Sequence, residues 1–393
     1  MRVLHNILRF APAAAVLALA AMQSARADVT DVMYIGDGSD NSVKVFDVTT
    51  GQAPASFKGT LVKSQGGLHG PRGLLIVEGG NLLVSDQNLD TSTNGDILLY
   101  DSATGNLLNR VVSHDEPNAP TVPRGIITFT SGPPSQLEHT DIFVADYTAE
   151  PQNNRPPTPG RVRTYSAVGA FTGDLPPPND PRIPLSRYHP RAVVIGPDGL
   201  LYVSNLPDPP SPDGSGLGGD VLRFEFDSLK TGKFIFKDVF IHETGGVGQL
   251  NRPEGICFGP DGKLYVTSFA DVNTGVSDRH HVNHDMIRIY QGPSGNKPGA
   301  FIDAIDLDPQ FAGPGQPQPR AFAQALLFGP GGRLFVPING NGPDTGSVRS
   351  YDVTMKTFPF QTIVPSAVSG GQLGQPWYLT FGKTNPSTLA YGP

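Results

Sequence analysis

The stretch PRAVVIGPDGLLYVSN, residues 190–205, and its near copy RPEGICFGPDGKLYVTS, residues 252–268, determine how this chain folds. Each begins with an apolar run, turns at Gly-Pro-Asp-Gly and continues as a second apolar run containing Leu-Tyr-Val. Glycine readily adopts the positive φ that tight turns need, so an Asp-Gly turn between two apolar runs predicts a β-hairpin. A third copy, AQALLFGPGGRLFVPI, occupies residues 323–338. The hairpin is therefore an internal repeat.

Two looser copies extend the repeat toward the N-terminus. They are PRGLLIVEGGNLLVSD at 71–86 and the pair PRGIITFT and DIFVAD within 123–146. Each hairpin is followed by a third apolar run and a last short one, which makes five four-stranded units. The third runs lie at 96–102, 161–167, 220–226, 286–292 and 347–353.

The two ends of the chain carry incomplete units that complement each other. QPWYLTFG at 375–382 looks like a first strand with no successor, whereas 32–37 and 42–48 look like second and third strands with no predecessor. A ring that joins these ends in one sheet leaves no open edge strand. The sequence therefore predicts an all-β protein: a six-bladed β-propeller with four-stranded blades, closed by N-terminal strands that share a blade with the C-terminal strand.

Composition excludes several other classes of protein. The 393 residues include 47 Gly and 39 Pro, a density that breaks helices every few residues. The single cysteine, Cys257, cannot form a disulfide within the chain. A net charge of −7 argues against binding nucleic acid through the overall field.

The first 27 residues read as a secretory signal peptide. Arg2 and Arg9 give a charged start, a short apolar stretch follows, and Ala25-Arg26-Ala27 is a small-residue cleavage site. We therefore expect residues 28–393 to form a single propeller domain that is exported to the periplasm or the outside. No other segment is apolar enough to predict an integral membrane helix.

One position in the repeat points to a ligand site. The second residue of each first strand should face a common channel mouth, and three of the six are arginine. Arginine presents a planar fork that grips a carboxylate or a phosphate, so the sequence predicts a small anionic ligand there. Alternatively, the arginines bond backbone carbonyls and neighbouring carboxylates and are structural. The six residues are Arg72, Arg124, Arg191, Glu254, Gln324 and Trp377.

Long loops gather on the same face as these residues. They follow the second strands at 147–160, 206–219, 269–285 and 339–346, whereas the turns within the hairpins are tight. Loops that carry function concentrate in this way, so the face is expected to be the working one. A scaffold that uses these loops to bind a protein partner is the alternative function.

The repeat resembles the NHL-repeat and SMP-30/gluconolactonase-like superfamily of six-bladed propellers, over nearly all of residues 28–393. Because that fold hosts lactonases, lyases and binding modules, the resemblance implies an architecture and not one chemistry. In SMP-30-like enzymes, acidic and amide side chains at first-strand starts hold a metal. Here the resemblance supplies only Glu254 and, weakly, Gln324.

Three arginines beside a divalent cation are electrostatically unfavourable. A metal-dependent lactonase or lyase is therefore an alternative, and no clear ligand set supports a divalent cofactor. A quinone-cofactor dehydrogenase is more distant, because its other expected signatures are not recognisable.

Histidines offer a further route to catalysis. His69 and His189 precede Arg72 and Arg191, and histidine titrates near neutral pH. Propeller lyases of the NHL type use channel-facing histidines, so the resemblance makes both residues candidate general bases, together with Glu254. The sequence thus predicts a ligand-binding propeller and leaves open whether it is also a lyase or hydrolase.

Overall fold

The computed structural model describes residues 30–91, 93–131, 140–148, 159–206, 218–227, 232–244, 249–270, 284–308, 320–340 and 342–392. The predicted signal peptide and most of three long loops, 147–160, 206–219 and 269–285, lie outside these ranges. Within them, helical structure is confined to single 3-10 turns such as Ser64–Gly66. No described helix is long and apolar enough to cross a membrane.

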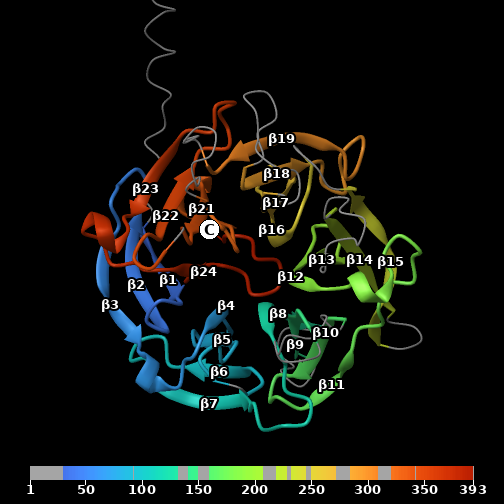
Figure 1. The fold of residues 1–393 in the computed structure, drawn as a ribbon, viewed down its shortest axis with the longest axis horizontal. Coiled ribbons are helices and arrows are strands. Elements are labelled where there is room, and N and C mark those ends of the chain that lie inside the picture. The colour runs from blue at the N-terminus through green and yellow to red at the C-terminus, as the bar shows by residue number, and fades with distance from the viewer. Residues whose placement is uncertain are drawn as a thin grey trace, which may run out of the picture.

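Six four-stranded antiparallel sheets stand around a central axis as the blades of a propeller (Figure 1). The all-β, six-bladed prediction is confirmed. We number the blades I to VI from the one that holds the N-terminal strands. Blade I is formed by β24 (Pro376–Phe381), β1 (Thr30–Asp37), β2 (Ser42–Thr49) and β3 (Ser56–Val62), and blade II by β4 (Pro71–Ile76), β5 (Leu82–Asp86), β6 (Asp96–Tyr100) and β7 (Leu107–Val112). Blade III is formed by β8 (Pro123–Thr130), β9 (Thr140–Asp146), β10 (Arg161–Ser166) and β11 (Phe171–Asp174), and blade IV by β12 (Pro190–Ile195), β13 (Leu201–Asn205), β14 (Asp220–Asp227) and β15 (Lys233–His242). Blade V is formed by β16 (Pro253–Phe258), β17 (Leu264–Ser268), β18 (Met286–Tyr290) and β19 (Phe301–Asp306), and blade VI by β20 (Leu327–Phe328), β21 (Leu334–Ile338), β22 (Ser347–Tyr351) and β23 (Phe360–Val364).

The ring closes in blade I, as the sequence predicts. Strand β24 pairs antiparallel with β1, from Met33 opposite Phe381 to Asp37 opposite Pro376. Both carboxylate oxygens of Asp37 accept bonds from the backbone just before β24, at Gly374 and Gln375. The first and last strands of the described chain are thus hydrogen-bonded neighbours: β24 covers the edge of β1 and becomes the innermost strand of the blade.

The repeated hairpin is held by its own tyrosine and aspartate. In blade IV the hydroxyl of Tyr202 donates to Asp198 in the turn, and Tyr265 donates to Asp261 in blade V, each at 3.0 Å. The Tyr202 ring also packs edge-on against Phe258 of the next blade, with centroids 4.9 Å apart. One side chain therefore fixes both the turn and the contact between blades, which is why Gly-Pro-Asp-Gly and Leu-Tyr-Val recur together.

The first strands pack so closely around the axis that side chains are excluded at some positions. A Cβ on Gly73 would lie 2.7 Å from the carbonyl oxygen of Arg124. A Cβ on Gly125 would lie 2.8 Å from Cα of Ala192. The glycine of the Pro-Arg-Gly motif is therefore required because the next blade approaches too closely for a side chain. Arg72 and Arg124 directly precede these two glycines, so their backbone is held by the same close packing.

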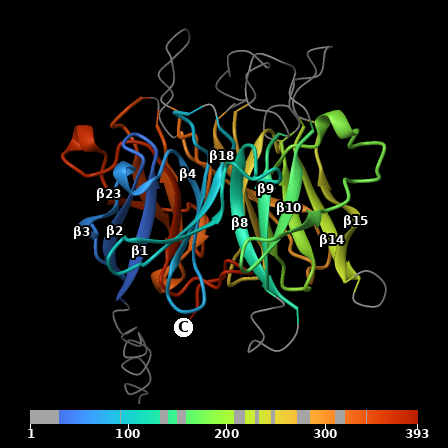
Figure 2. The same ribbon diagram turned by 90° about the horizontal axis from the view of Figure 1, so that it is seen from below.

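The C-terminal segment closes the opposite end of the channel. After β24 it crosses the axis, and the carbonyl oxygens of Pro386 and Ser387 accept bonds from Thr128 and Ile195. Those amides stand at the far ends of β8 and β12, in blades III and IV. The segment can be followed across the centre in Figure 1, and the C-terminus is marked on the lower side of the ring in Figure 2.

Candidate functional site

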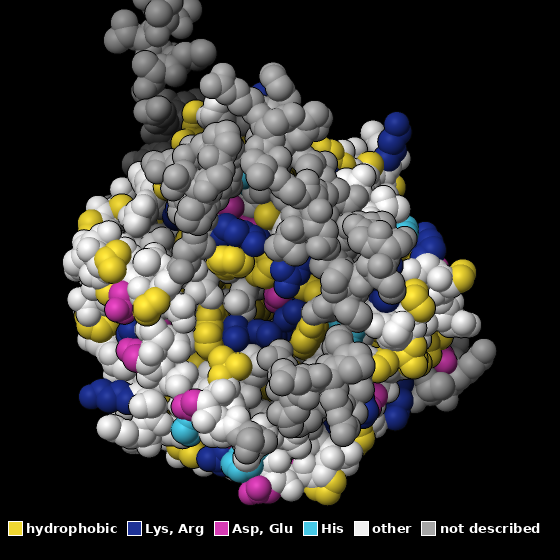
Figure 3. All heavy atoms as spheres, in the orientation of Figure 1, with side chains coloured by type: hydrophobic (Ala, Val, Ile, Leu, Met, Phe, Trp, Pro, Cys, Tyr) yellow, Lys and Arg dark blue, Asp and Glu magenta, His cyan; other side chains and the backbone are white. Residues whose placement is uncertain are grey.

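The second residues of the first strands meet at one mouth of the channel. Lysine and arginine side chains gather there around a central hollow, with acidic and hydrophobic groups among them (Figure 3). Arg191, Glu254 and Trp377 are buried, and Arg72 and Arg124 are half-buried. The predicted candidates therefore share one site, although no observation here tests their roles.

Gln324 connects three blades across the channel. Its side-chain oxygen Oε1 accepts from Nη1 of Arg72 at 2.6 Å and lies 3.5 Å from Nη1 of Arg124. Gln324 lies just before β20 of blade VI, whereas Arg124 belongs to blade III on the opposite side of the ring. Two cations thus converge on one neutral oxygen at the centre of the mouth.

Arg72 is fixed on all sides by neutral partners. Its guanidinium carbon lies 3.5 Å from the ring centroid of Trp377, a close cation–π contact, and its Nε donates to Gln87 at 2.8 Å. Trp377 in turn packs against Gly38, where an added Cβ would lie 2.2 Å from the indole ring. Arg72 therefore occupies one face of the Trp377 ring in this structure.

Arg191 forms the ion pair of the site. Its Nη1 lies 3.2 Å from Oε1 of Glu254, and its guanidinium carbon lies 3.7 Å from the ring centroid of Tyr147. Both charged side chains of this pair are 6% exposed. Glu254, a candidate general base, is thus the counter-ion of Arg191 as the structure stands.

The positive charge at the mouth is not balanced by the described residues. Among these residues Arg72 and Arg124 have no ion pair, and Nε of Arg124 and Nε of Arg191 are buried without an acceptor. Burial, reinforced by the positive charge of Arg191, lowers the pKa of Arg124 to about 10. Burial also lowers the pKa of Arg72, and nearby Arg124 acts in the same direction. A bound anion would relieve both effects.

The candidate histidines occupy different environments. His189 is fully buried, with Nδ1 2.9 Å from the carbonyl oxygen of Tyr147 and Nε2 3.3 Å from that of Ser186. Its ring is therefore engaged by the backbone in this arrangement. The side chain of His69 is 38% exposed, and its Nδ1 lies 2.8 Å from Asp90. Their predicted role as bases is untested, and His69 is the more accessible of the two.

Polar side chains at the ends of second strands hold the chain in position. Asp86 accepts the backbone N–H of His69, Asp146 accepts those of Thr121 and Val122, and Asn205 accepts that of His189. Each accepted group lies just before the first strand of the same blade. These residues therefore aim the strands that carry the arginines. In the described part of the chain, no group of three or more His, Cys, Asp or Glu side chains could hold a metal ion.

Sequence reasoning missed four residues that shape the site. Gln87 and Tyr147 contact Arg72 and Arg191, as described above. Ser85 Oγ donates to the carbonyl oxygen of Arg124 at 2.7 Å, and Ser204 Oγ donates to that of Glu254 at 2.6 Å. Both serines lie at the same position of the repeat, in Leu-Val-Ser-Asp and Leu-Tyr-Val-Ser-Asn, and this recurrence could have drawn attention to them. Only the fold shows that each serine bonds the next blade.

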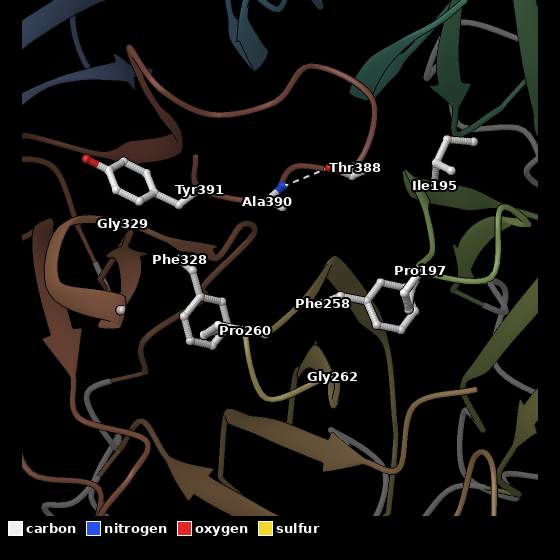
Figure 4. Close-up of a pocket in the computed structure, with 12 residues that line it drawn as sticks. Ile195, Pro197, Phe258, Pro260, Gly262, Phe328, Gly329, Thr388, Ala390 and Tyr391 are labelled. Carbon is white, nitrogen blue, oxygen red and sulfur yellow. Dashed lines mark hydrogen bonds between the residues drawn. The ribbon is translucent and has the colours of Figure 1, made fainter. Parts of the chain in front are cut away.

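A second hollow lies at the other end of the channel. It has a volume of about 310 Å³ and is lined by hairpin turns of blades IV to VI and by the C-terminal segment (Figure 4). Phe258, Phe328 and Tyr391 contribute rings to its wall, which is almost entirely apolar. No predicted site residue lies here, so the two ends of the channel differ sharply in character.

Comparisons with known proteins give no sequence match and a set of distant structural similarities. No protein-family profile matches the chain, and no curated protein matches it in sequence. Among solved structures, one provisionally named a 6-phosphogluconolactonase, from Bacteroides uniformis, is 15% identical with a TM-score of 0.49, over 90% of this chain and 99% of that one. One provisionally named a gluconolactonase is 12% identical with a TM-score of 0.44, over 86% and 91%. The PQQ-bound aldose sugar dehydrogenase of Streptomyces coelicolor is 15% identical with a TM-score of 0.41, over 75% and 81%.

The protein is a six-bladed β-propeller, the fold expected from its resemblance to the SMP-30/NHL-like superfamily. The strand pairings of the six blades establish this fold. Chemistry must be argued from the residues at the channel mouth.

Proposed function

We propose that this protein binds a small organic anion, a sugar acid or another carboxylate, at the arginine-lined mouth of its channel. The observation that carries the proposal is the convergence of Arg72 and Arg124 on the neutral oxygen of Gln324, with no carboxylate pairing either arginine among the described residues. Buried charge without a counter-ion is costly, and an anion accepting several guanidinium N–H bonds removes that cost.

Calorimetric titration with sugar acids and small carboxylates tests the proposal. Arg124→Ala should weaken binding about ten- to a hundredfold, since a hydrogen bond to a charged group contributes ~1.5–3 kcal/mol. Arg161→Ala is the matched control, because Arg161 lies in the same blade and contacts exposed Asp174. If no anion binds, or if both variants behave alike, the arginines are structural and the long-loop scaffold becomes the better hypothesis.

We also propose that the protein is exported and that catalysis, where present, is of the lyase or hydrolase type. Fractionation of expressing cells, followed by N-terminal sequencing, should give a mature chain that begins at Asp28 outside the cytoplasm. An anion identified by titration is then followed for turnover, with Glu254→Gln removing the candidate base. Recovery of the intact chain in the cytoplasm would overturn the export proposal.

A further inference from the structure

The oxygen of Gln324 occupies a position that suits an anionic oxygen. Arg72 approaches it from blade II and Arg124 from blade III, at 2.6 and 3.5 Å. A guanidinium group bonds a carboxylate about twice as strongly as it bonds a neutral carbonyl. A carboxylate entering the channel is therefore expected to displace the amide and take its place between the two arginines.

A second acceptor is missing beside Arg191. Its Nη1 is engaged by Glu254, but its Nε is buried without an acceptor in the described part of the chain. The Gln324 oxygen accepts from Arg72 and Arg124, whereas Arg191 pairs with Glu254, so a group that replaces that oxygen takes over only the contacts with Arg72 and Arg124. One carboxylate placed between Arg72 and Arg124 leaves the Arg191 donor unsatisfied.

The charges at the mouth lead to the same conclusion. Three guanidinium groups face the single carboxylate of Glu254. The other carboxyl acting on Arg72 is that of Asp86, and burial raises its pKa to about 7, so it is only partly ionised at neutral pH. The described residues therefore leave more than one positive charge unbalanced, which a monoanion cannot neutralise.

We infer that the ligand carries two carboxylates: one replaces the Gln324 oxygen between Arg72 and Arg124, and the other accepts from Arg191. The ligand class is thus a dicarboxylate, such as the diacid of a sugar. This inference rests on the proposed function and narrows it.

Calorimetry with gluconate, glucarate and glucose 6-phosphate tests the inference on the purified protein. Gluconate and glucarate are six-carbon sugar acids that differ by one carboxylate, whereas glucose 6-phosphate carries its charge on one group. Glucarate should bind about ten- to a hundredfold more tightly than either of the others. Equal affinities for gluconate and glucarate, or tighter binding of the phosphate, would overturn the inference.

Two variants test where each carboxylate of the ligand binds. Arg191→Ala should bring the affinity for glucarate close to that for gluconate. Gln324→Glu places a permanent carboxylate between Arg72 and Arg124, so it should raise the melting temperature without ligand and weaken glucarate binding at least tenfold. Gln361→Glu, an exposed position on β23, is its matched control and should do neither.

Different outcomes would refute the proposed anion site and the dicarboxylate inference. If glucarate binds no better than gluconate while Arg124→Ala still abolishes both, the anion site stands and the dicarboxylate inference falls. If no anion shows binding that depends on Arg124, the proposed function itself falls. A Gln324→Glu protein that binds glucarate as the wild type does would also refute the place assigned to the first carboxylate.

Discussion

At the scale of single residues, the mouth of the channel is defined by contacts between side chains from different blades. Arg72 stacks on Trp377 and bonds Gln324, and Arg191 pairs with Glu254. The sequence allows these residues to be named, because each occupies the same place in its repeat. It does not show which residue meets which, since Gln324 reaches across the axis to arginines that lie 252 and 200 positions away.

Glu254 acts as a counter-ion in this arrangement, which leads to an unusual expectation. Among the described residues, Glu254 is the carboxylate paired with one of the three arginines at the mouth. Glu254→Gln removes that negative charge and should increase the affinity for a carboxylate ligand roughly tenfold, because the arginines then lack it as a counter-ion. Titration calorimetry at neutral pH measures the effect. Glu225→Gln, which alters an exposed pair with Lys237, should leave affinity unchanged. A large loss of affinity in Glu254→Gln would show instead that Glu254 itself bonds the ligand.

Asp86 gives the molecule a specific dependence on pH. Burial raises its pKa from 3.8 to about 7, so the folded protein retains a proton there that the unfolded chain releases above about pH 4. Its contribution to stability therefore falls as pH rises from about 4 to 7 and is constant above. Asp86→Asn cannot ionise, so its melting temperature relative to the wild type should rise over this window. Thermal denaturation from pH 4 to 8 measures this difference.

Asp37→Asn is the control for that experiment. Burial opposes ionisation of Asp37, but Lys44 and the backbone N–H groups of Gly374 and Gln375 hold its pKa below its usual value, so the variant loses a charged partner and should be destabilised at neutral pH. A difference between Asp86→Asn and wild type that stays constant from pH 4 to 8 would contradict the role assigned to Asp86.

At the scale of elements, the hairpins and their order were predictable because local chemistry specifies them. Gly199 and Gly262 adopt φ of 75° and 73° in the two best copies of the turn, as an Asp-Gly turn requires. Strand β3, Ser56–Val62, was not predicted, because its residues are mostly exposed or half-buried and show no continuous apolar run. The hydrogen bonds from Ser85 and Ser204 to the next blade could not be predicted from the sequence either, since they depend on how neighbouring strands are placed in space.

The serine bridge at Ser85 should position Arg124. Ser85→Ala removes the donor to the carbonyl oxygen of Arg124 and leaves a buried acceptor unsatisfied, at a cost of about 1–3 kcal/mol in the free energy of unfolding. Because the strand that carries Arg124 is then less firmly held, anion affinity should fall several-fold well below the melting temperature. Ser102→Ala, which removes a half-buried hydroxyl that bonds the carbonyl oxygen of Gly80, should change neither quantity much. A loss of stability with unchanged affinity would limit the bridge to a structural role.

At the scale of the whole molecule, the two ends of the channel are lined by different kinds of residue. The mouth with the arginines is polar and charged, whereas the opposite end is sealed by the C-terminal segment around an apolar hollow. Sequence reasoning placed the arginines at one common mouth, because each occupies the same position in its repeat, and the expectation that this is the working face stays a prediction. It did not identify the seal, since residues 383–393 show no repeat pattern and their role follows only from crossing the axis.

Removal of residues 385–393 should therefore destabilise the fold while sparing the site. The deletion eliminates two hydrogen bonds to blades III and IV and the burial of Leu389, which is 2% exposed. We expect a fall in melting temperature of roughly 5–10 °C and faster hydrogen exchange at Thr128 and Ile195. Anion affinity measured at low temperature should stay within a factor of about two, because the segment lies at the far end of the channel. A large loss of affinity would show that the two ends are coupled.

The closure of blade I also constrains how the polypeptide is made. Asp37 meets Gly374 337 positions later, so the sheet that contains the first described strand cannot be completed until nearly all of the chain has left the ribosome. Until β24 has been synthesised, one edge of β1 in the nascent chain therefore has no strand to pair with. A product that terminates just before residue 374 contains all the strands of blades II to VI but lacks β24, so it cannot close the ring, and the unpaired edge of β1 can pair with other nascent chains.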